Sequence, residues 1–406
     1  MGAPQWIRSS FTGAPALDNA AGTLISVLDA CLINGFDSKT LTSLSVSSGV
    51  ATATISGGHS YQVRATVLIE GATPSELNGR KRIISTTSTT FTFSSVSSDQ
   101  TATGTITSKI APLSSWSKAF SGTNKAAYQS THVDATGYYL RVLDTATYPT
   151  YTGRVAQYAG YEAMTDIDTG TNRFPTTTQL TDGLLILKSY HTDGTDSPWE
   201  FIGDELGFYL FVTVRSGYKP KAVLQFGDLV ADSSNDVHLC GVHGIDSVST
   251  TYPPEFYGDF VTGVNSSASN PGFYLARSYT GSPGAVQGGK LNLTAVTGSI
   301  TYQDGNNIPY PFPIDSGIRL SEVLVHENPT TNVGVPRGKM PGMYALLHRT
   351  PLTDLTVIDS ITGLSGEELL DINVYGASTW VTDANDPANN SSYGGGCCIG
   401  IKNDWR

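Results

Sequence analysis

Short apolar runs separated by turn residues dominate this chain, and the clearest pair of runs lies in residues 199–214. Residues 199–202 and 208–214 have the length of strands, and the segment between them contains Gly203, Asp204 and Gly207, which favour turns. This pattern predicts a β-hairpin. In the second run apolar residues follow one another instead of alternating with polar ones, so we expect both faces of that strand to be covered by other parts of the chain.

One segment clearly shows the periodicity of a helix. In residues 15–32 apolar side chains recur at intervals of three and four, which predicts a helix with one apolar face. Asp18 or Asn19 is available to cap its start, and Asn34-Gly35 is a stop signal. Such a helix needs a partner surface in water, so we expect its apolar face to pack on the larger domain that follows. The residues of that face are Leu24, Ile25, Leu28, Cys31 and Leu32.

The pattern of polar and apolar residues changes after the helix. From residue 40 to residue 108, short stretches of alternating polarity are separated by turn signals such as Ser48-Gly49, Gly57-Gly58 and Asn78-Gly79. This spacing predicts a small β-sandwich or barrel of about five or six strands. We therefore divide the chain into an N-terminal segment with the helix (1–36), an inserted β-module (37–109) and a main β domain (110–406). The two ends of the module should lie close together.

Longer strand-like segments rich in aromatic residues make up the remainder of the chain. Each is bounded by Gly, Pro, Asn or Asp, and no repeat of fixed period is visible, which argues against a propeller or solenoid. Charged residues are only 15% of the chain and 43 residues are glycine, which suits strands joined by tight turns. The sequence therefore predicts a mainly β protein, with a large β-sandwich-like main domain, an N-terminal helix and an inserted small β-sandwich or barrel module.

The charge and the apolar pattern argue against two kinds of partner. The formal net charge of −11 argues against a nucleic-acid-binding protein, because binding to the phosphate backbone needs clustered Lys and Arg. We interpret the one compact basic run, Arg80-Lys81-Arg82, as a solvated or edge-protecting face of a strand. No apolar run reaches the roughly 18 to 20 residues of a membrane-spanning helix. The opening residues lack the pattern of a secretory signal, so we expect synthesis in the cytoplasm.

Histidine and cysteine side chains raise the question of a metal site. His238, Cys240 and His243 are ligand types for zinc. In a continuous strand His238 and Cys240 share one face while His243 points away, so we favour packed strand residues, although a bound ion stays open. The four cysteines, with Cys397 and Cys398 adjacent, do not form a disulfide framework, and we expect reduced, mostly packed thiols.

Two acidic loops, residues 166–170 and 191–196, are candidates for ion binding or catalysis. Calcium loops need more oxygen ligands and usually a closing Glu, so we interpret both as Asx turns that join strands, with a bound ion again left open. Glu162, Asp166 and Asp168 are also candidates for the two carboxylates of a glycosidase. Such carboxylates lie about 5 to 9.5 Å apart, a distance that the sequence does not give.

The sequence contains no motif for nucleotide binding or for a nucleophilic serine. Gly394-Gly395-Gly396 precedes Cys397 and does not open a helix, and neither a Gly-x-x-x-x-Gly-Lys-Ser/Thr loop nor a Gly-x-Ser-x-Gly elbow occurs. We therefore assign no catalytic, cofactor-binding or metal-binding residue, and we expect no cofactor and no enzymatic activity.

Several segments, taken together, resemble a group of tailed-bacteriophage virion proteins. They are residues 24–56, 67–93, 116–130, 160–175, 337–348 and 403–406, so the similarity runs over nearly the whole chain. The segment with GATPSELNG (71–79) and TFTF (90–93) also resembles a small β-module that recurs as an insertion in phage tail and baseplate proteins. The resemblance implies a virion protein of the tail or baseplate, made in the bacterial host cytoplasm, and it brings no catalytic residues.

The sequence leaves three hypotheses open, in order of preference. The first is a structural component of the tail tip or baseplate that contacts other tail proteins and is present in symmetric copies. The second is a receptor- or glycan-binding protein at the tail periphery, whose exposed aromatic rings stack on host-surface sugars. The third is a hydrolase of cell-surface polysaccharide that uses Glu162, Asp166 or Asp168. The aromatic candidates for the second hypothesis are Tyr138, Tyr139, Tyr148, Tyr151 and Trp380.

Overall fold

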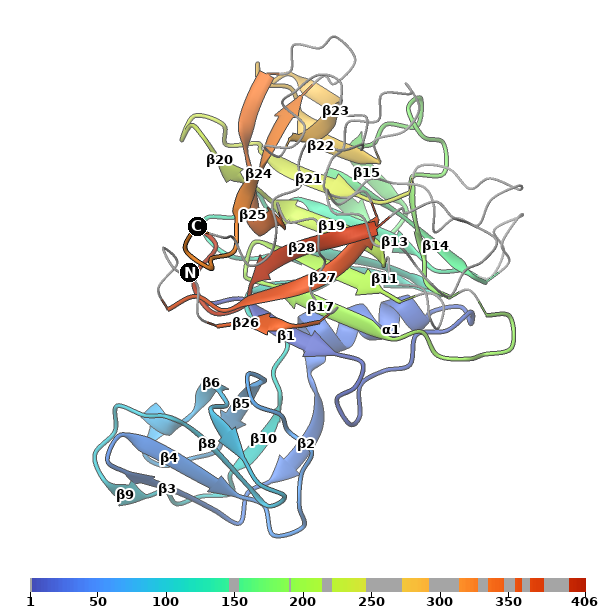
Figure 1. Ribbon diagram of the computed structural model, residues 1–406. Coiled ribbons are helices and arrows are strands. Elements are labelled where there is room, and N and C mark those ends of the chain that lie inside the picture. The colour runs from blue at the N-terminus through green and yellow to red at the C-terminus, as the bar shows by residue number, and fades with distance from the viewer. Residues whose placement is uncertain are drawn as a thin grey trace, which may run out of the picture.

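Antiparallel β-sheets build most of this protein, and one short α-helix lies near the N-terminus (Figure 1), which confirms the predicted mainly β fold. The computed structural model describes residues 2–145, 153–189, 191–213, 221–245, 272–291, 314–327, 335–346, 355–359, 366–375 and 394–406. These residues contain four sheets, two in the main body and two within residues 36–110.

The largest sheet has thirteen strands. Their order is β1-β17-β18-β19-β21-β22-β23-β24-β25-β28-β27-β26, and β20 pairs with β25. Segments from both ends of the sequence meet in this sheet, since β1 pairs with β17 and β28 lies between β25 and β27. The strands are β1 (Gln5–Arg8), β17 (Trp199–Gly203), β18 (Gly207–Val212), β19 (Ala222–Asp228), β20 (Val230–Ala231), β21 (Cys240–His243), β22 (Phe273–Arg277), β23 (Pro283–Leu291), β24 (Leu320–Glu327), β25 (Val335–Leu346), β26 (Val357–Ile358), β27 (Leu369–Tyr375) and β28 (Gly394–Gly400).

The predicted hairpin is the pair β17–β18, in which Trp199 lies opposite Val212. Every residue of β18 is buried. Because successive side chains of a strand point to opposite faces, Phe208 belongs to one apolar core and Tyr209 to a second core on the other side of the sheet. The expectation that both faces of this strand are covered is confirmed.

The first core is covered by a sheet of six strands. Trp116 of this sheet packs edge-on against Phe208 of β18, with ring centroids 5.4 Å apart. Tyr128 and Tyr158 belong to the same core and are buried. The sheet therefore forms a second layer against the β17–β19 region. Its strands are β11 (Trp116–Gly122), β12 (Lys125–Ser130), β13 (Tyr139–Leu143), β14 (Val155–Asp166), β15 (Thr169–Phe174) and β16 (Leu184–Leu187).

The second core is covered by the C-terminal strands of the large sheet itself. Met343 of β25 and Ile399 of β28 belong to this core together with Tyr209. The Tyr209 hydroxyl donates to the Pro341 carbonyl at 2.9 Å, and its ring lies 5.6 Å from that of Trp405. The large sheet thus supplies both the middle layer and part of the cover on its far side.

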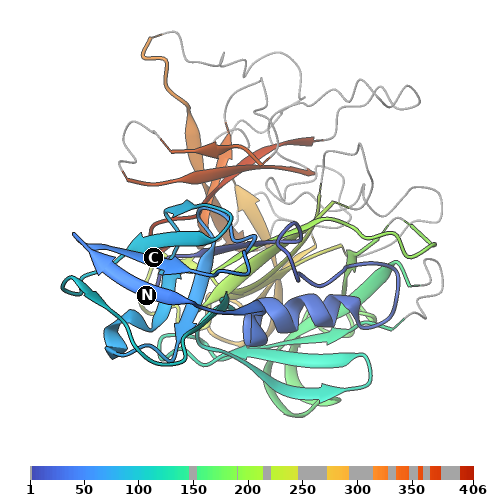
Figure 2. The same cartoon turned by 90° about the horizontal axis from the view of Figure 1, so that it is seen from below.

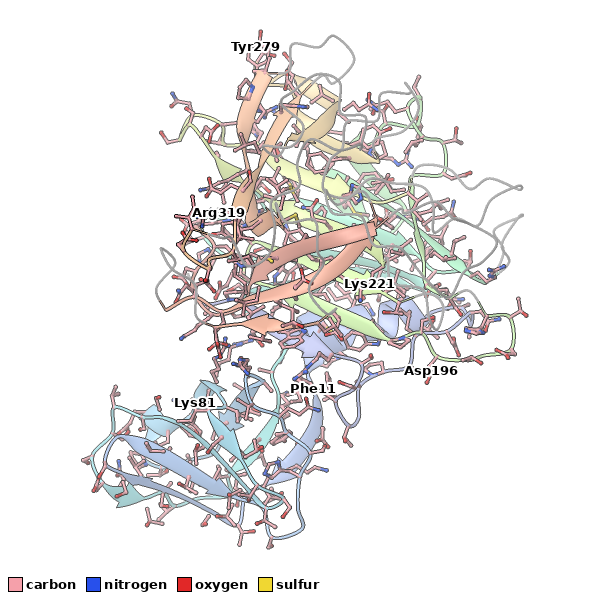
Figure 3. The ribbon with its side chains drawn as sticks, viewed as in Figure 1. Phe11, Lys81, Asp196, Lys221, Tyr279 and Arg319 are labelled. Atoms are coloured by element: carbon pink, nitrogen blue, oxygen red, sulfur yellow. The ribbon has the colours of Figure 1, made fainter. Side chains whose placement is uncertain are left out.

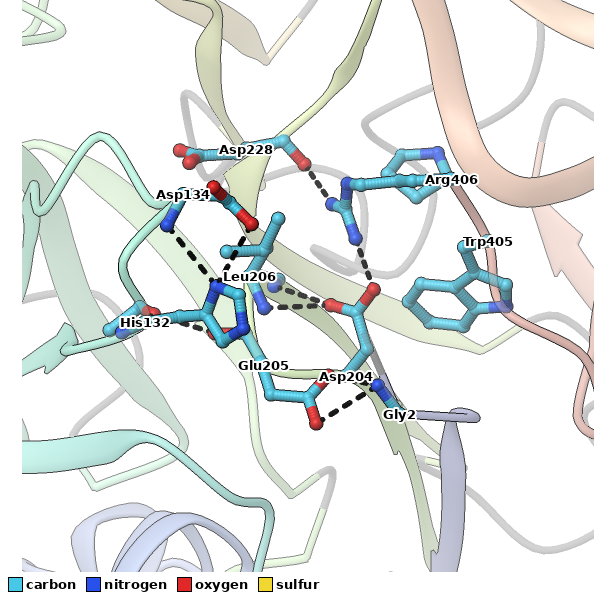
Figure 4. Close-up of polar contacts among 12 residues, drawn as sticks. Gly2, His132, Asp134, Asp204, Glu205, Leu206, Asp228, Trp405 and Arg406 are labelled. Atoms are coloured by element: carbon cyan, nitrogen blue, oxygen red, sulfur yellow. Dashed lines mark hydrogen bonds and ion pairs between the residues drawn. The ribbon is translucent and has the colours of Figure 1, made fainter.

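The turn of the β17–β18 hairpin holds residues from both ends of the sequence (Figure 4). The Asp204 carboxylate accepts a hydrogen bond from the backbone N–H of Leu206 at 2.8 Å and forms an ion pair with Arg406. The backbone N–H of Gly2 donates to the Glu205 carboxylate at 3.0 Å. The central hairpin is therefore a structural junction as well as a core element.

The helix is shorter than predicted. α1 (Thr23–Asp29) is followed by one π-helical segment (Ala30–Asn34), so the expected start near residue 15 is wrong. Asp18 instead forms an Asx turn by accepting from the backbone N–H two residues on, at 2.8 Å. Gly22 then takes a φ of 83°, a left-handed conformation outside the helix. The predicted stop is correct, since Gly35 ends the helical segment with a φ of 65°.

Side chains from the six-stranded sheet and its connections fix α1 in place. The backbone N–H of Leu24 donates to Asp144 at 2.8 Å, which satisfies a donor that the first turn of a helix leaves free. Asp144 also forms an ion pair with Lys188 at 2.5 Å, and both side chains are fully buried. At the other end, the Tyr128 hydroxyl donates to the Asp29 carboxylate at 2.7 Å. These polar contacts anchor both ends of α1 to the main body.

Residues 36–110 form the two remaining sheets (Figure 2). The strand orders are β2-β10-β5-β6 and β7-β8-β4-β3-β9. Nine strands are present where about five or six were predicted, because β2, β7 and β9 add edge strands. The strands are β2 (Phe36–Thr40), β3 (Ser43–Ser47), β4 (Val50–Thr54), β5 (Thr66–Glu70), β6 (Gly79–Arg82), β7 (Ser85–Thr86), β8 (Thr90–Ser94), β9 (Gln100–Thr101) and β10 (Thr107–Ile110).

The chain leaves and re-enters the main body at neighbouring points. β2 pairs with β10, and Phe36 lies opposite Ile110. The outgoing and returning segments of the chain lie very close together at Gly35. A Cβ atom at this position would lie 2.2 Å from the Ile110 carbonyl oxygen, so a glycine is required there. Residues 36–110 thus have the geometry of an insertion between two adjacent strands, and they project from one end of the main body (Figure 1).

Candidate functional site

Three residues that the sequence nominated for different reasons meet in one polar cluster on the main body. The Tyr138 hydroxyl lies 2.7 Å from His238 Nδ1, and His238 Nε2 lies 3.3 Å from Arg277 Nη1. The same guanidinium forms two hydrogen bonds with Glu162, at 2.6 and 2.7 Å. Asn172 completes the cluster by donating to Glu162 at 2.8 Å. We call these five residues the Arg277 network.

The Arg277 network joins two sheets. Tyr138 lies just before β13, and Glu162 is on β14, both in the six-stranded sheet. Arg277 is the last residue of β22 in the large sheet, and His238 belongs to the connection before β21. A guanidinium that binds a carboxylate through two parallel N–H groups fixes orientation as well as charge. The network therefore links the six-stranded sheet to the large sheet.

The Glu162 carboxyl is held in its charged form. Partial burial acts to raise its pKa, but the hydrogen bonds from Arg277 and Asn172 and the charge of Arg277 outweigh this effect, so the pKa lies below its ordinary value. Arg277 in turn has a raised pKa, chiefly because of its hydrogen bond to Glu162. A general acid needs the opposite shift, towards neutral pH. Glu162 is thus positioned as an ion-pair partner.

A second arginine extends this polar system into the large sheet. Arg337 of β25 binds both carboxylate oxygens of Asp236, at 2.6 and 2.9 Å, and one oxygen of Glu327 at 2.6 Å. It also donates to the backbone carbonyl of Arg277 at 2.9 Å. The Arg337 side chain is 1% exposed, so these contacts are shielded from water. The two arginines together hold the end of β22 in place.

The carboxylates proposed for a glycosidase do not form a pair. Glu162 and Asp166 are four residues apart on β14, and a register irregularity lies between them. Glu162 is turned to Arg277, whereas Asp166 accepts from the backbone N–H of Asp168 at 2.8 Å. Asp168 pairs instead with Arg141 at 2.6 Å. The structure therefore does not bring these three side chains around a common substrate position.

Both acidic loops are Asx turns, as interpreted from the sequence. Asp166 closes the turn between β14 and β15, and Asp193 accepts from the backbone N–H and the hydroxyl of Thr195 at 3.1 and 2.7 Å. Within the part of the chain that the structure describes, no three His, Cys, Asp or Glu side chains are grouped so that they could hold a metal ion.

The three zinc candidates, all within the described residues, are not grouped so that they could hold a metal ion. His238 precedes β21 and faces Tyr138, whereas Cys240 and His243 are buried within the strand. The expectation that His238 and Cys240 share a strand face is wrong, because the strand begins only at Cys240. Burial raises the pKa of the Cys240 thiol. All four cysteines of the chain fall within the described residues, and each is buried and outside any disulfide.

The aromatic residues nominated for glycan stacking are at least partly buried or lie outside the described residues. Tyr138 is only 8% exposed, so its assignment as an exposed ring is wrong. Tyr139 is half-buried on β13. Tyr148, Tyr151 and Trp380 lie outside the described residues.

The basic run of the module lies on an edge strand, as one of the two interpretations from the sequence expects, but two of its side chains contact the main body, so it is not simply a solvated face. Arg82 of edge strand β6 forms an ion pair with Glu368 at 2.7 Å and donates to the Ile401 carbonyl. Arg64 pairs with the same Glu368 at 2.7 Å, and Arg80 donates to the Pro112 carbonyl at 2.8 Å. These contacts, which we call the module seam, hold residues 36–110 against the main body.

Replacing Glu368 with Gln should loosen the module seam, because it removes the charge that Arg64 and Arg82 share. We expect a loss of about 1 kcal/mol, since these side chains are partly exposed. Hydrogen–deuterium exchange of β6 should become faster. Glu322→Gln is the matched control, because it removes an exposed pair with Lys339 on the main body. Unchanged exchange of β6 in the Glu368 variant would contradict a seam held by this carboxylate.

The same seam should weaken in acid. Burial acts to raise the pKa of Glu368, but Arg64 and Arg82 lower it below its usual value of 4.5. A lowered folded-state pKa contributes stability above the unfolded value, and this stability is lost as pH falls through the folded-state value. After correction for the slower intrinsic exchange of amides in acid, the protection of β6 in the natural protein should therefore decrease as the pH drops below about 4.5, and the Gln variant should lack this component.

Comparisons with known proteins add little to this picture. No protein-family model matches the chain, and a search of curated proteins finds no similar sequence. Among solved structures, "Phage phi92 endosialidase" is 11% identical, with a TM-score of 0.16 over 90% of this chain and 52% of that one. The chain thus spans about half the length of that structure, and a likeness this weak supports no assignment. Within the described ranges, no helix combines the length and apolar character needed to cross a membrane.

Proposed function

We propose that this chain is a structural component of a tailed-bacteriophage particle, located in the tail tip or baseplate and acting through contacts with other proteins. The observation that carries the proposal is the construction of residues 36–110. They form two sheets of their own, enter and leave through the adjacent strands β2 and β10, and are held by the module seam. A projecting unit held in a fixed orientation suits contact with a neighbouring subunit. The sequence resemblance to virion proteins supports the same function.

The polar groups of the main body support a role without catalysis. In the Arg277 network and around Arg337, the carboxylates of Glu162, Asp236 and Glu327 are each bound by a guanidinium. Such pairs link strands and fix the orientation of the side chains that they join. We therefore propose that the protein acts as a scaffold, in symmetric copies around the tail axis and in contact with other tail or baseplate proteins.

The location in the particle has a direct test. Mass spectrometry of purified virions should detect this chain, and an antibody against it should label the tail tip or baseplate in negatively stained particles. Absence of the chain from purified virions would overturn the proposal. Labelling at the head would contradict the location but not the structural role.

The proposed division at residues 37–109 is tested by replacing this segment with a short Gly/Ser linker. Because the two ends of the segment lie next to each other, a short linker can close the gap, and loop closure depends only weakly on length. We expect the remaining chain to unfold cooperatively in urea and to assemble less well with its partners. An aggregated product without cooperative unfolding would mean that the module and the main body share one folding unit.

A further inference from the structure

Tyr279 is the one aromatic side chain among the described residues that is largely exposed. It is 61% exposed, and the other large apolar side chains with comparable exposure are Val, Ile and Leu. It lies in the turn between β22 and β23, at the end of the main body away from the module (Figure 3). The exposed ring is accessible to a binding partner. Residues 36–110 do not cover it, because they lie at the opposite end of the main body (Figure 3).

The backbone of this turn is fixed on both sides of Tyr279. The Tyr279 N–H donates to the Glu327 carboxylate at 2.7 Å. Gly281 donates to the Ser278 carbonyl at 2.9 Å, and the Arg277 guanidinium donates to the Gly281 carbonyl at 3.1 Å. An exposed ring on a fixed backbone loses less conformational entropy when it binds than a ring on a mobile loop.

Buried charged groups stabilise this turn. Glu327 is 5% exposed and Arg337 is 3% exposed, and removing such groups from water costs several kcal/mol unless they are well paired. Arg337 bonds to Glu327 and to the Arg277 carbonyl, and the Arg277 guanidinium is held by Glu162. The two arginine clusters therefore converge on the backbone of one surface turn.

The chemistry of the turn favours a neutral sugar. Residues 278–284 carry no charged side chain, and the Ser278, Thr280 and Ser282 hydroxyls form a hydrogen-bonded series, at 2.7 and 3.1 Å. A stable protein partner buries roughly 800 Å² on each side, whereas this turn exposes one aromatic ring among small or hydroxyl-bearing residues. A pyranose ring matches the turn better, since it has an apolar C–H face and a hydroxyl-bearing rim.

We propose that the Tyr279 turn is a binding element for a neutral saccharide. One sugar ring stacks on the Tyr279 ring, and its hydroxyl groups exchange hydrogen bonds with the Ser and Thr hydroxyls beside it. This inference rests on the turn itself and stands independently of the location of the chain in a particle.

Saturation-transfer NMR on the full chain tests the proposal. The probes are methyl glycosides of glucose, galactose, mannose, N-acetylglucosamine and rhamnose. We expect at least one to receive saturation at its ring C–H protons. The signal should fall at least tenfold in Tyr279→Ala and persist in Tyr279→Phe, which keeps the ring. Val133→Ala, at a side chain 90% exposed elsewhere on the main body, is the control for a surface truncation.

Two results would overturn the assignment. One is the absence of saturation transfer to all five glycosides, and the other is equal transfer in the natural chain and in Tyr279→Ala. If Tyr279→Ala instead abolishes binding to another virion protein while no glycoside responds, the turn is a protein contact and the saccharide assignment is wrong. Because Tyr279 is largely exposed, the Ala variant should keep the unfolding midpoint of the natural chain, which excludes misfolding as the cause.

Discussion

Replacing Phe208 with Ala should lower the free energy of unfolding by about 3 to 5 kcal/mol, the usual cost of truncating an aromatic side chain in a packed core. Phe208 is 1% exposed, and its ring centroid lies 4.9 Å from that of Phe201, 5.4 Å from that of Trp116 and 6.4 Å from that of Phe226. These rings come from both layers around the first core. Their positions on separate strands limit how far they can collapse into the cavity.

Urea unfolding of the full chain measures this loss. Val133→Ala serves as the control, because its side chain is 90% exposed and its removal should change stability by less than about 0.5 kcal/mol. The midpoint of the Phe208 variant should shift while the dependence on urea stays the same. An unchanged midpoint would show that β18 contributes much less to the core than its burial indicates.

The β17–β18 hairpin was predictable because its signal is local. Consecutive apolar residues identify a strand covered on both faces, and Gly203 and Asp204 mark the turn. The strand β28 (Gly394–Gly400) was not predicted, because three successive glycines are unfavourable in a strand. It exists because β25 and β27 pair with it on both sides, and this pairing is not encoded in the segment itself.

The start of the helix could not be predicted from its own residues. Asp18 has the chemistry of a cap, but it closes an Asx turn before the helix begins. Asp144 acts as the helix cap instead. Its carboxylate accepts a hydrogen bond from the backbone N–H of Leu24, which is 120 residues away in the sequence. The same limit applies to Arg82, since its partner Glu368 is 286 residues away. The local sequence shows which residues are charged, but it does not show their partners, which are far away in the sequence.

The candidate site shows this limit most clearly. Glu162 and His238 were identified by residue type, but each was assigned to a different chemistry. Arg277, which joins them, has no local signature, and it meets Glu162 across 115 residues. Tyr279 did have a local signal, because it lies in a Ser-Tyr-Thr-Gly-Ser-Pro turn between strand-like segments. Turn composition identifies an aromatic residue at a loop tip better than aromatic content alone does.

Replacing Arg337 with Met should cost about 3 to 5 kcal/mol, because the change leaves two carboxylates without their cation in a buried site. The Arg337 side chain is 1% exposed, and the side chains of its partners Glu327 and Asp236 are 7% and 17% exposed. Lys339→Met is the matched control on the same strand, since its pair with Glu322 is exposed and should be worth less than about 1 kcal/mol.

The pH dependence of the Arg337→Met variant separates lost charge pairing from lost packing. Stranded carboxylates in a buried site are relieved when they take up protons, so the folded state should bind more protons than the unfolded state as pH falls from 7 to about 5. The stability difference from the natural chain should therefore shrink over this range, and adding Glu327→Gln should recover part of the loss at pH 7. Urea unfolding at both pH values measures these differences. A loss that is independent of pH and unaffected by Glu327→Gln would mean that Arg337 contributes through packing, and that the buried charges do not hold the Tyr279 turn.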